Sequence, residues 1–212
     1  MSEYSVEVIN LCKSINSQYI LNNINMNFKR GNIYSIVGAN GSGKSMLLKS
    51  IAGLILPDKG TIKIYGEELR RGEFYQKIGL LLDSPGLLPQ YSAVKNLEIL
   101  ASINNKISTR EIKDFLMKLG LNPEDKRSVK KYSLGMKQKV GIVQALMENP
   151  EIIILDEPMN GLDENSAEIV RNLLFDLKNE NKTIIITSHN KEDIELLSDY
   201  IYKIEKGCLV DF

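Results

Sequence analysis

The chain has 212 residues, which suits one large domain, and its hydrophobic content of 43% and charged content of 25% are ordinary for a globular protein. Lys and Arg together number 27, as do Asp and Glu, and this zero net charge argues against a dedicated DNA or RNA binder. No apolar run reaches the roughly 18 to 20 residues of a membrane span, and residues 1–10 lack the apolar stretch of a secretory signal.

The first part of the chain predicts strands, because short apolar and β-branched runs are separated by turn residues. The predicted strands cover residues 6–11, 24–28, 32–37, 61–64 and 78–82. A glycine-rich loop at residues 38–43 follows the third strand, and helical spacing runs from Lys44 to about Leu54. Cys12 and Cys208 are the only cysteines and lack metal-ligand spacing, so we expect two buried, reduced thiols of a cytosolic protein.

The middle part, residues 84–148, predicts helices. Ser92 suits the N-cap of one helix, and Ser108 or Thr109 suits the N-cap of the next. A further helix is expected to begin near Leu134, with apolar residues at helical spacing after it.

The last part alternates strands with helices. The predicted elements are strands at residues 152–155 and 183–187, helices at 169–177 and 193–197, and a hairpin at 200–212. Continuous apolar runs at both strands are typical of strands buried on both faces, and the alternation favours a largely parallel sheet. We therefore expect a single α/β domain over residues 1–212, with N-terminal antiparallel strands, a core of residues 1–83 and 149–212, and an inserted helical subdomain of residues 84–148.

Residues 38–45, Gly-Ala-Asn-Gly-Ser-Gly-Lys-Ser, have the pattern of a phosphate-binding loop between a strand and a helix. Glycines let successive backbone N–H groups point at an anion, and the helix that follows directs its positive end to the same place. Lys44 would contact the terminal phosphates of a nucleotide, and the Ser45 hydroxyl would ligate Mg²⁺. The residues expected to bind the nucleotide are Gly38, Ala39, Asn40, Gly41, Ser42, Gly43, Lys44, Ser45 and Met46.

Two acids, Asp156 and Glu157, follow the buried strand at residues 152–155. Open α/β sheets bind ligands at the carboxyl edge of their strands, which is where these carboxylates would lie. Asp156 would hold Mg²⁺, and Glu157 would polarise the water that attacks a phosphate. Taken alone, the pair is explained equally well as the acidic start of a helix, and the phosphate loop favours the catalytic interpretation.

A third segment, Tyr-Ser-Leu-Gly-Met at residues 132–136, is called the signature segment below. It places a hydroxyl group and a glycine at an expected helix N-terminus, where an anion can bind. Taken alone, Ser133 is better explained as an ordinary helix N-cap.

These motifs, in this order, make the chain resemble the nucleotide-binding subunits of ABC transporters along essentially its whole length. The resemblance rests on the phosphate loop, the signature segment, the acidic strand end, Asn-Gly-Leu-Asp at residues 160–163, and His189, the only histidine. It implies a P-loop nucleotide hydrolase core that hydrolyses ATP with Mg²⁺, with Glu157 and His189 as catalytic residues.

The resemblance also implies partners. Two such subunits pack head to tail, so that Ser133, Gly135 and Met136 of one contact the ATP held by the other, and Asp163 lies at the dimer seam. The pair would drive separate integral membrane permease subunits from the cytoplasmic face of the membrane, with no role for nucleic acid. A homodimer and a heterodimer both remain open.

Three positions depart from the usual pattern of the family. Its signature usually reads Leu-Ser-Gly-Gly-Gln, so Leu134 stands in place of the first glycine. The aromatic residue that stacks on adenine usually falls at Ile15, and Tyr19 is the nearest substitute. Asp83 stands where a glutamine usually touches Mg²⁺, and we expect Asp83 to act at the metal and tune the coupling between hydrolysis and transport.

Within the family, the signature segment, the acid at position 83 and the sequence of residues 156–163 look like the exporters that protect bacteria from bacitracin or lantibiotics. We therefore expect export of an antimicrobial peptide or a drug-like compound. The alternative is a soluble ABC-type ATPase that acts on DNA or the ribosome. Those relatives carry a coiled-coil or zinc insertion, or a second domain with a basic linker, and this sequence shows none of these features.

Overall fold

Two sheets build the protein in the computed structural model, which describes residues 3–70, 75–82 and 85–210. The first sheet is antiparallel, with the order β2-β1-β4-β5, and the second has the order β10-β9-β3-β8-β7-β6. Strands β9, β3, β8, β7 and β6 are parallel, and β10 pairs antiparallel with β9. This arrangement confirms the expected α/β fold.

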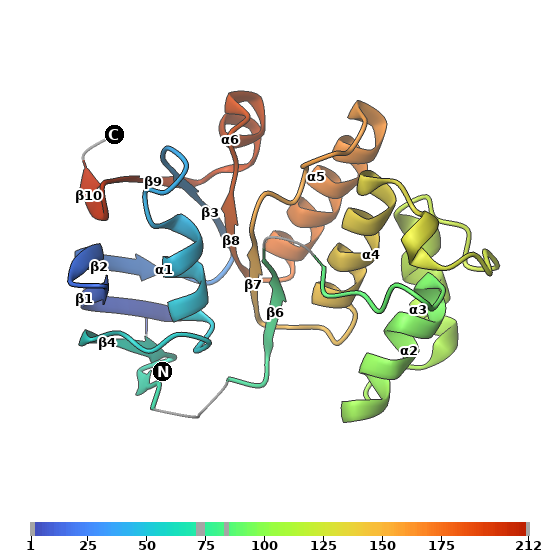
Figure 1. Ribbon diagram of the computed structural model, residues 1–212, viewed down its shortest axis with the longest axis horizontal. Coiled ribbons are helices and arrows are strands. Elements are labelled where there is room, and N and C mark those ends of the chain that lie inside the picture. The colour runs from blue at the N-terminus through green and yellow to red at the C-terminus, as the bar shows by residue number, and fades with distance from the viewer. Residues whose placement is uncertain (1–2, 71–74, 83–84, 211–212) are drawn as a thin grey trace.

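The strands are β1 (Val6–Ile15), β2 (Gln18–Phe28), β3 (Asn32–Val37), β4 (Lys59–Ile64), β5 (Glu67–Glu68), β6 (Ile78–Leu81), β7 (Ile152–Leu155), β8 (Thr183–Thr187), β9 (Tyr200–Glu205) and β10 (Cys208–Val210). The helices are α1 (Lys44–Ile51), α2 (Ala93–Asn104), α3 (Thr109–Lys118), the short 3-10 helix η1 (Val129–Lys131), α4 (Leu134–Leu146), α5 (Glu164–Asn179) and α6 (Lys191–Leu197). Figure 1 shows α1 between the two sheets, and α2 to α5 on the opposite side of the second sheet.

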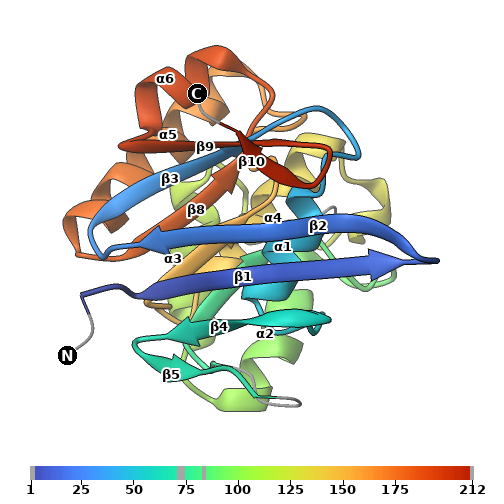
Figure 2. The same ribbon diagram turned by 90° about the vertical axis from the view of Figure 1, so that its left-hand side faces the viewer.

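The first hairpin is longer than predicted at both strands. Its turn consists of Asn16 and Ser17, whose φ angles of 49° and 64° both lie in the left-handed region. Such two-residue turns match the twist of the strands they join. Shifts of register between Val8 and Leu11 break the alternation of buried and exposed residues, which explains why periodicity alone ended the first strand too early. Figure 2 shows β1 and β2 side by side in the first sheet, with β4 next to β1.

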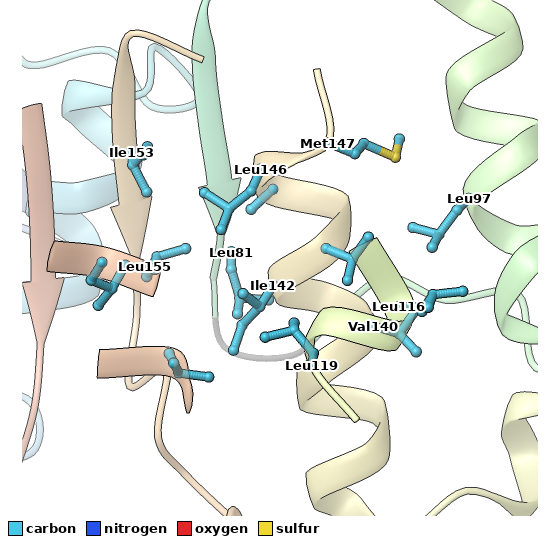
Figure 3. Close-up of a cluster of buried hydrophobic side chains, with 14 of the residues drawn as sticks. Leu81, Leu97, Leu116, Leu119, Val140, Ile142, Leu146, Met147, Ile153 and Leu155 are labelled. Atoms are coloured by element: carbon cyan, nitrogen blue, oxygen red, sulfur yellow. The ribbon is translucent and has the colours of Figure 1, made fainter. Parts of the chain in front are cut away.

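Strand β7 is buried on both faces, as its continuous apolar run predicts. Ile152 and Ile154 belong to the cluster that contains α1 and the first sheet. Ile153 and Leu155 belong to the second cluster, which is formed with α2 to α5. Successive side chains of a strand point to opposite faces, so β7 joins both halves of the core. Figure 3 shows members of the second cluster from β6, β7, α2, α3 and α4.

Helices α3, α4 and α5 each begin directly after a residue whose side chain caps the first turn. The Ser108 side chain accepts from Glu111 N at 3.3 Å within a complete capping box, and Ser133 accepts from Met136 N at 3.2 Å at the start of α4. The helix predicted at residues 169–177 begins earlier, because the Asp163 carboxylate caps it by accepting from Ser166 N at 2.9 Å.

Three further predictions need correction. Helix α1 ends at Ile51 rather than near Leu54, because the chain turns at Gly53 with a φ of 76°. Helix α6 begins at Lys191, two residues before the predicted start, with Asn190 as its N-cap. Cys12 and Cys208 are free thiols as expected but only partly buried, because they lie in an irregular part of β1 and in the edge strand β10.

Among the described residues, no helix combines the length and the apolar character that crossing a bilayer requires.

A buried ion pair connects α5 to α6. Arg171 is 7% exposed, and its Nη1 donates to Asp193 Oδ1 at 2.7 Å, while Asp193 is 2% exposed. Arg171 also pairs with Glu164, whose side chain faces solvent. The two helices begin just after Asp163 and His189, so this pair fixes both segments relative to each other.

We predict that Asp193→Ala lowers the free energy of unfolding by about 3 kcal/mol, because it leaves a buried guanidinium without its buried partner. Urea unfolding followed by circular dichroism measures the change. The control is Lys95→Ala, which removes the exposed pair between Lys95 and Glu98 and should cost less than about 0.5 kcal/mol. An equal effect of the two substitutions would contradict a structural role for the buried pair.

Candidate functional site

The phosphate loop lies between β3 and α1, and two other segments hold it. Gly207 N, in the turn between β9 and β10, donates to Ser42 O at 3.0 Å. On the side of β2, a Cβ atom at Gly43 would lie 2.8 Å from Ile20 O, and Gly43 has a φ of 110°. Only glycine combines that φ with so close an approach of backbone, which is the local reason for the glycine before Lys44.

A cavity of about 500 Å³ opens between this loop and the ends of β7 and β8. It brings together most of the residues that the motifs predict to act on a nucleotide. Its lining consists of Ile20, Asn40, Gly41, Gly43, Lys44, Ser45, Met46, Asp156, Glu157, Asn160 and His189. The other predicted loop residues, Gly38, Ala39 and Ser42, line a second hollow of about 330 Å³ beside Lys203, Glu205 and Lys206.

Lys44 and Ser45, the last two residues of the phosphate-loop motif, both have side chains oriented by hydrogen bonds. Lys44 Nζ donates to Gly38 O at 2.7 Å and to Ala39 O at 3.2 Å. Ser45 Oγ donates to Asp156 Oδ2 at 2.7 Å, which joins the start of α1 to the end of β7.

The oxygens of Ser45 and Asp156 fit a hard cation such as Mg²⁺, which prefers hydroxyl, carboxylate, water and phosphate oxygens. The part of the chain that the structure describes holds no group of three or more His, Cys, Asp or Glu residues that could bind a metal on its own. A cation here would therefore need ligands from the nucleotide and water, as Mg²⁺ does in phosphate sites.

Thr187, at the end of β8, completes the acidic edge, and sequence reasoning missed it. Its Oγ1 donates to Asp156 Oδ1 at 2.5 Å and accepts from Glu157 N at 2.9 Å. One hydroxyl group therefore fixes the Asp156 side chain and the Glu157 backbone. A threonine in a buried β-branched strand gives no sequence signal of this role, because its contact depends on the register between β7 and β8.

Glu157 has an unusual backbone and an unusual environment. Its φ of 50° is left-handed, which is rare for residues other than glycine and clusters at functional sites. Burial raises the pKa of its carboxyl group, and the electrostatic interaction with the neighbouring His189 opposes part of that shift. His189 N donates to Glu157 Oε2 at 3.3 Å, and His189 Nε2 lies 3.0 Å from Oε1, although Oε1 accepts no hydrogen bond. A raised carboxyl pKa suits a general base.

The predicted partner-facing residues lie outside this cavity. Ser133 is exposed at the N-terminus of α4, and Gly135 and Met136 are partly buried beside it. Asp163 is exposed at the N-terminus of α5. Further along α4, the buried side chain of Gln138 donates its Nε2 to Glu157 O at 2.9 Å, a contact that the sequence did not reveal.

The structure leaves the adenine contact and the expected metal contact of Asp83 as predictions. Ile20 lines the cavity, whereas Ile15 and Tyr19 do not, and Tyr19 is 54% exposed. Asp83 lies outside the described residues.

The fold and the cavity define a nucleotide-binding cassette of the phosphate-loop class. The sequence profile of the ABC transporter family matches residues 21–160. The chain belongs to this family as an ATP-binding, ATP-hydrolysing subunit, which confirms the resemblance seen in its motifs.

Relatives cover nearly the whole chain. The uncharacterized ABC transporter ATP-binding protein YybJ of Bacillus subtilis is 44% identical over 96% of this chain and 94% of its own length. The lantibiotic transport ATP-binding protein SrtF of Streptococcus pyogenes is 38% identical over 97% of this chain and 89% of its own length. The bacitracin transport ATP-binding protein BcrA of Bacillus licheniformis is 39% identical over 97% of this chain and 68% of its own length.

Solved structures agree with these relatives. The dimeric structure of MJ0796, a bacterial ABC transporter cassette, has a TM-score of 0.88 and 26% identity, and the match covers 97% of both chains. The same cassette is known in a dimeric post-hydrolysis state bound to ADP and phosphate, with the same TM-score and identity. Cassettes of this family work with a partner ATPase and a membrane permease, and the alternative of an ATPase acting on DNA or the ribosome is not supported.

We predict that Glu157→Gln stabilises the protein at neutral pH. The raised pKa means that the folded state binds the proton of Glu157 more tightly than the unfolded state does, so stability falls as pH rises through the folded pKa. The variant removes this partly buried charge, and its melting temperature should exceed that of the wild type at about pH 7.5 and converge with it near about pH 4. Exposed Glu168→Gln is the control, and a similar pH-dependent gain there would contradict this origin of the effect.

Proposed function

We propose that the cavity binds MgATP and hydrolyses it, as one half of a dimer that drives an exporter of antimicrobial peptides. The observation that supports this proposal most directly is the convergence of five side chains, Lys44, Ser45, Asp156, Glu157 and His189, on one cavity next to the N-terminus of α1. A lysine, an oxygen pair for a cation, a partly buried carboxylate and an imidazole form a set suited to phosphoryl transfer to water.

The phosphates and the cation of MgATP each have proposed partners in this cavity. The backbone N–H groups of the phosphate loop and the first turn of α1 would hold the phosphate oxygens, since both present donors to an anion. Lys44 would leave the carbonyls of Gly38 and Ala39 to pair with the terminal phosphates. Ser45 and Asp156 would hold Mg²⁺, which neutralises charge on the phosphates.

Glu157 is the proposed general base. Its carboxylate would accept a proton from the water that attacks the γ-phosphate, and burial prepares it for this role by raising its pKa. His189 lies against both carboxylate oxygens and would orient the carboxylate while its imidazole reaches the phosphate.

The dimer would complete each site. Ser133, Gly135 and Met136 lie away from the cavity of their own subunit, at the end of a helix whose N–H groups can hold an anion. In a head-to-tail dimer they would contact the γ-phosphate held by the partner, with Asp163 at the seam. The helical subdomain of residues 84–148 would then carry this contact relative to the core of residues 1–83 and 149–212.

The proposed cargo is based on the relatives, two of which are named for lantibiotic and bacitracin transport. The chain would act peripherally at the cytoplasmic face of the membrane, with a homodimer or a heterodimer bound to separate permease subunits. Asp83 would tune the coupling between hydrolysis and transport.

We predict that Glu157→Gln lowers kcat for ATP hydrolysis at least about 100-fold while ATP binding remains, because the amide cannot accept the proton. Lys44→Ala should abolish ATP binding itself. ATPase assays and binding of a fluorescent ATP analogue measure the two effects, and gel filtration with ATP should show a dimer for Glu157→Gln and a monomer for Lys44→Ala.

Lys49, in the last turn of α1, is partly buried and does not line the cavity, so Lys49→Ala is a charge-matched control that should leave ATP binding unchanged. Wild-type turnover in the Glu157→Gln variant would contradict the general-base assignment, and ATP binding by Lys44→Ala would contradict the phosphate site.

We predict that the tagged chain, purified from its native cells in mild detergent, carries a multi-span membrane protein with it. Deleting its gene should lower the tolerance of the cells to a lantibiotic or to bacitracin at least about fourfold, and Glu157→Gln should not restore that tolerance, since export would need turnover. A chain recovered without any membrane protein would contradict the permease partnership, and unchanged tolerance to both compounds would contradict the cargo.

A further inference from the structure

Leu134, the residue after the N-cap of α4, lies over a neighbouring loop although its side chain is 61% exposed. A Cβ atom added to Gly161 would lie 2.7 Å from both Cγ and Cδ2 of Leu134, and 3.3 Å from its Cβ. The Leu134 side chain therefore occupies the space that any other residue at position 161 would need.

The contact also involves the backbone. A Cβ atom at Gly135 would lie 2.5 Å from Gly161 O, so the start of α4 and the loop at residues 158–163 pack at backbone distance. Gly161 itself has a φ of 74°, in the left-handed region. The loop and the helix end therefore approach each other so closely that neither Gly135 nor Gly161 has room for a side chain.

This loop is bonded directly to the proposed general base. Asn160 N donates to Glu157 O at 3.1 Å, and Gln138 Nε2, one turn along α4 from Leu134, donates to the same carbonyl at 2.9 Å. Gln138 Nε2 also lies 3.2 Å from Pro158 O. The backbone of Glu157 is thereby held from the loop on one side and from α4 on the other.

We propose that Leu134 is a positioning residue for Glu157, and that Leu134 and Gly161 form a size-matched pair that transmits the position of the helix end to the catalytic carboxylate. Leu134 packs against Gly161, Gly161 is next to Asn160 in the chain, and Asn160 N donates a hydrogen bond to Glu157 O. This inference rests on the proposed role of Glu157 and adds a residue of the signature segment that acts within its own subunit.

The chain offers a matched control for the conformational part of the effect. Gly120 has a φ of 71°, close to that of Gly161, but a Cβ atom there meets only the flexible end of Lys139 at 3.7 Å. An alanine at either position has the same backbone cost, so the difference between Gly161→Ala and Gly120→Ala isolates the contact with Leu134.

The experiment is a double-mutant cycle on ATP hydrolysis. We expect Gly161→Ala to lower kcat about tenfold more than Gly120→Ala does, with KM for ATP changed less than about twofold, because Gly161 does not line the nucleotide cavity. Leu134→Ala alone should lower kcat about threefold, since the loop loses its support. In the Leu134→Ala background, Gly161→Ala should then lower kcat no more than Gly120→Ala does, because the two Leu134 atoms at 2.7 Å are absent and the backbone cost remains.

Additive losses in the double variant would overturn the proposal, as would a Gly120→Ala variant as slow as Gly161→Ala. Thermal unfolding is measured for all variants. If Gly161→Ala does not fold, the added substitution Leu134→Ala should restore folding, which would support the contact between the two residues. Failure to restore folding would overturn the proposal. A wild-type chain without ATPase activity would instead refute the proposed function, so the two failures are distinguishable.

Discussion

Strand β7 has no face that meets water, and the position of the whole acidic edge depends on this constraint. Its four residues, Ile152–Leu155, are fully buried, with neighbours β6 and β8 on both sides. A strand held in this way cannot slide or rotate without exposing apolar side chains from both clusters of the core. The first polar residues after it must therefore emerge at one place, beside Ser45 and Thr187.

The constraint also explains how Glu157 can keep an unfavourable backbone. A left-handed φ on a residue with a side chain costs on the order of 1 kcal/mol, and such a residue persists only where its surroundings over-determine it. Glu157 N donates to Thr187 Oγ1, and its carbonyl accepts from Asn160 N and from Gln138 Nε2. Three hydrogen bonds of about 1 kcal/mol each outweigh the strain and direct the carboxylate into the cavity rather than along the strand.

The motifs predicted the site to the extent that its chemistry is local in sequence. The phosphate loop, Asp156 with Glu157, and His189 are each defined by a few neighbouring residues, and the structure brings them to one cavity. Thr187 and Gln138 act through contacts between distant segments, so no pattern in their own neighbourhood marks them.

The same division holds for the fold. Buried strands and capped helices followed from composition and spacing, because each depends on residues a few positions apart. The extent of the first hairpin did not follow, because bulges and a turn at Asn16 and Ser17 interrupt the alternation. The early start of α5 did not follow either, because Asp163, read as a residue of the dimer seam, also serves as its cap.

The first two turns of helix α4 have different surroundings. Its N-terminus, at Ser133, is exposed, whereas Gln138 is buried and bonded to the backbone of Glu157. The turns beyond Gln138 are packed into the core through Val140 and Ile142. A rigid helix cannot change position at its first turn and keep it at the second. A displacement of the exposed end would therefore also displace Gln138, so α4 connects the surface at Ser133 with the backbone of the proposed general base.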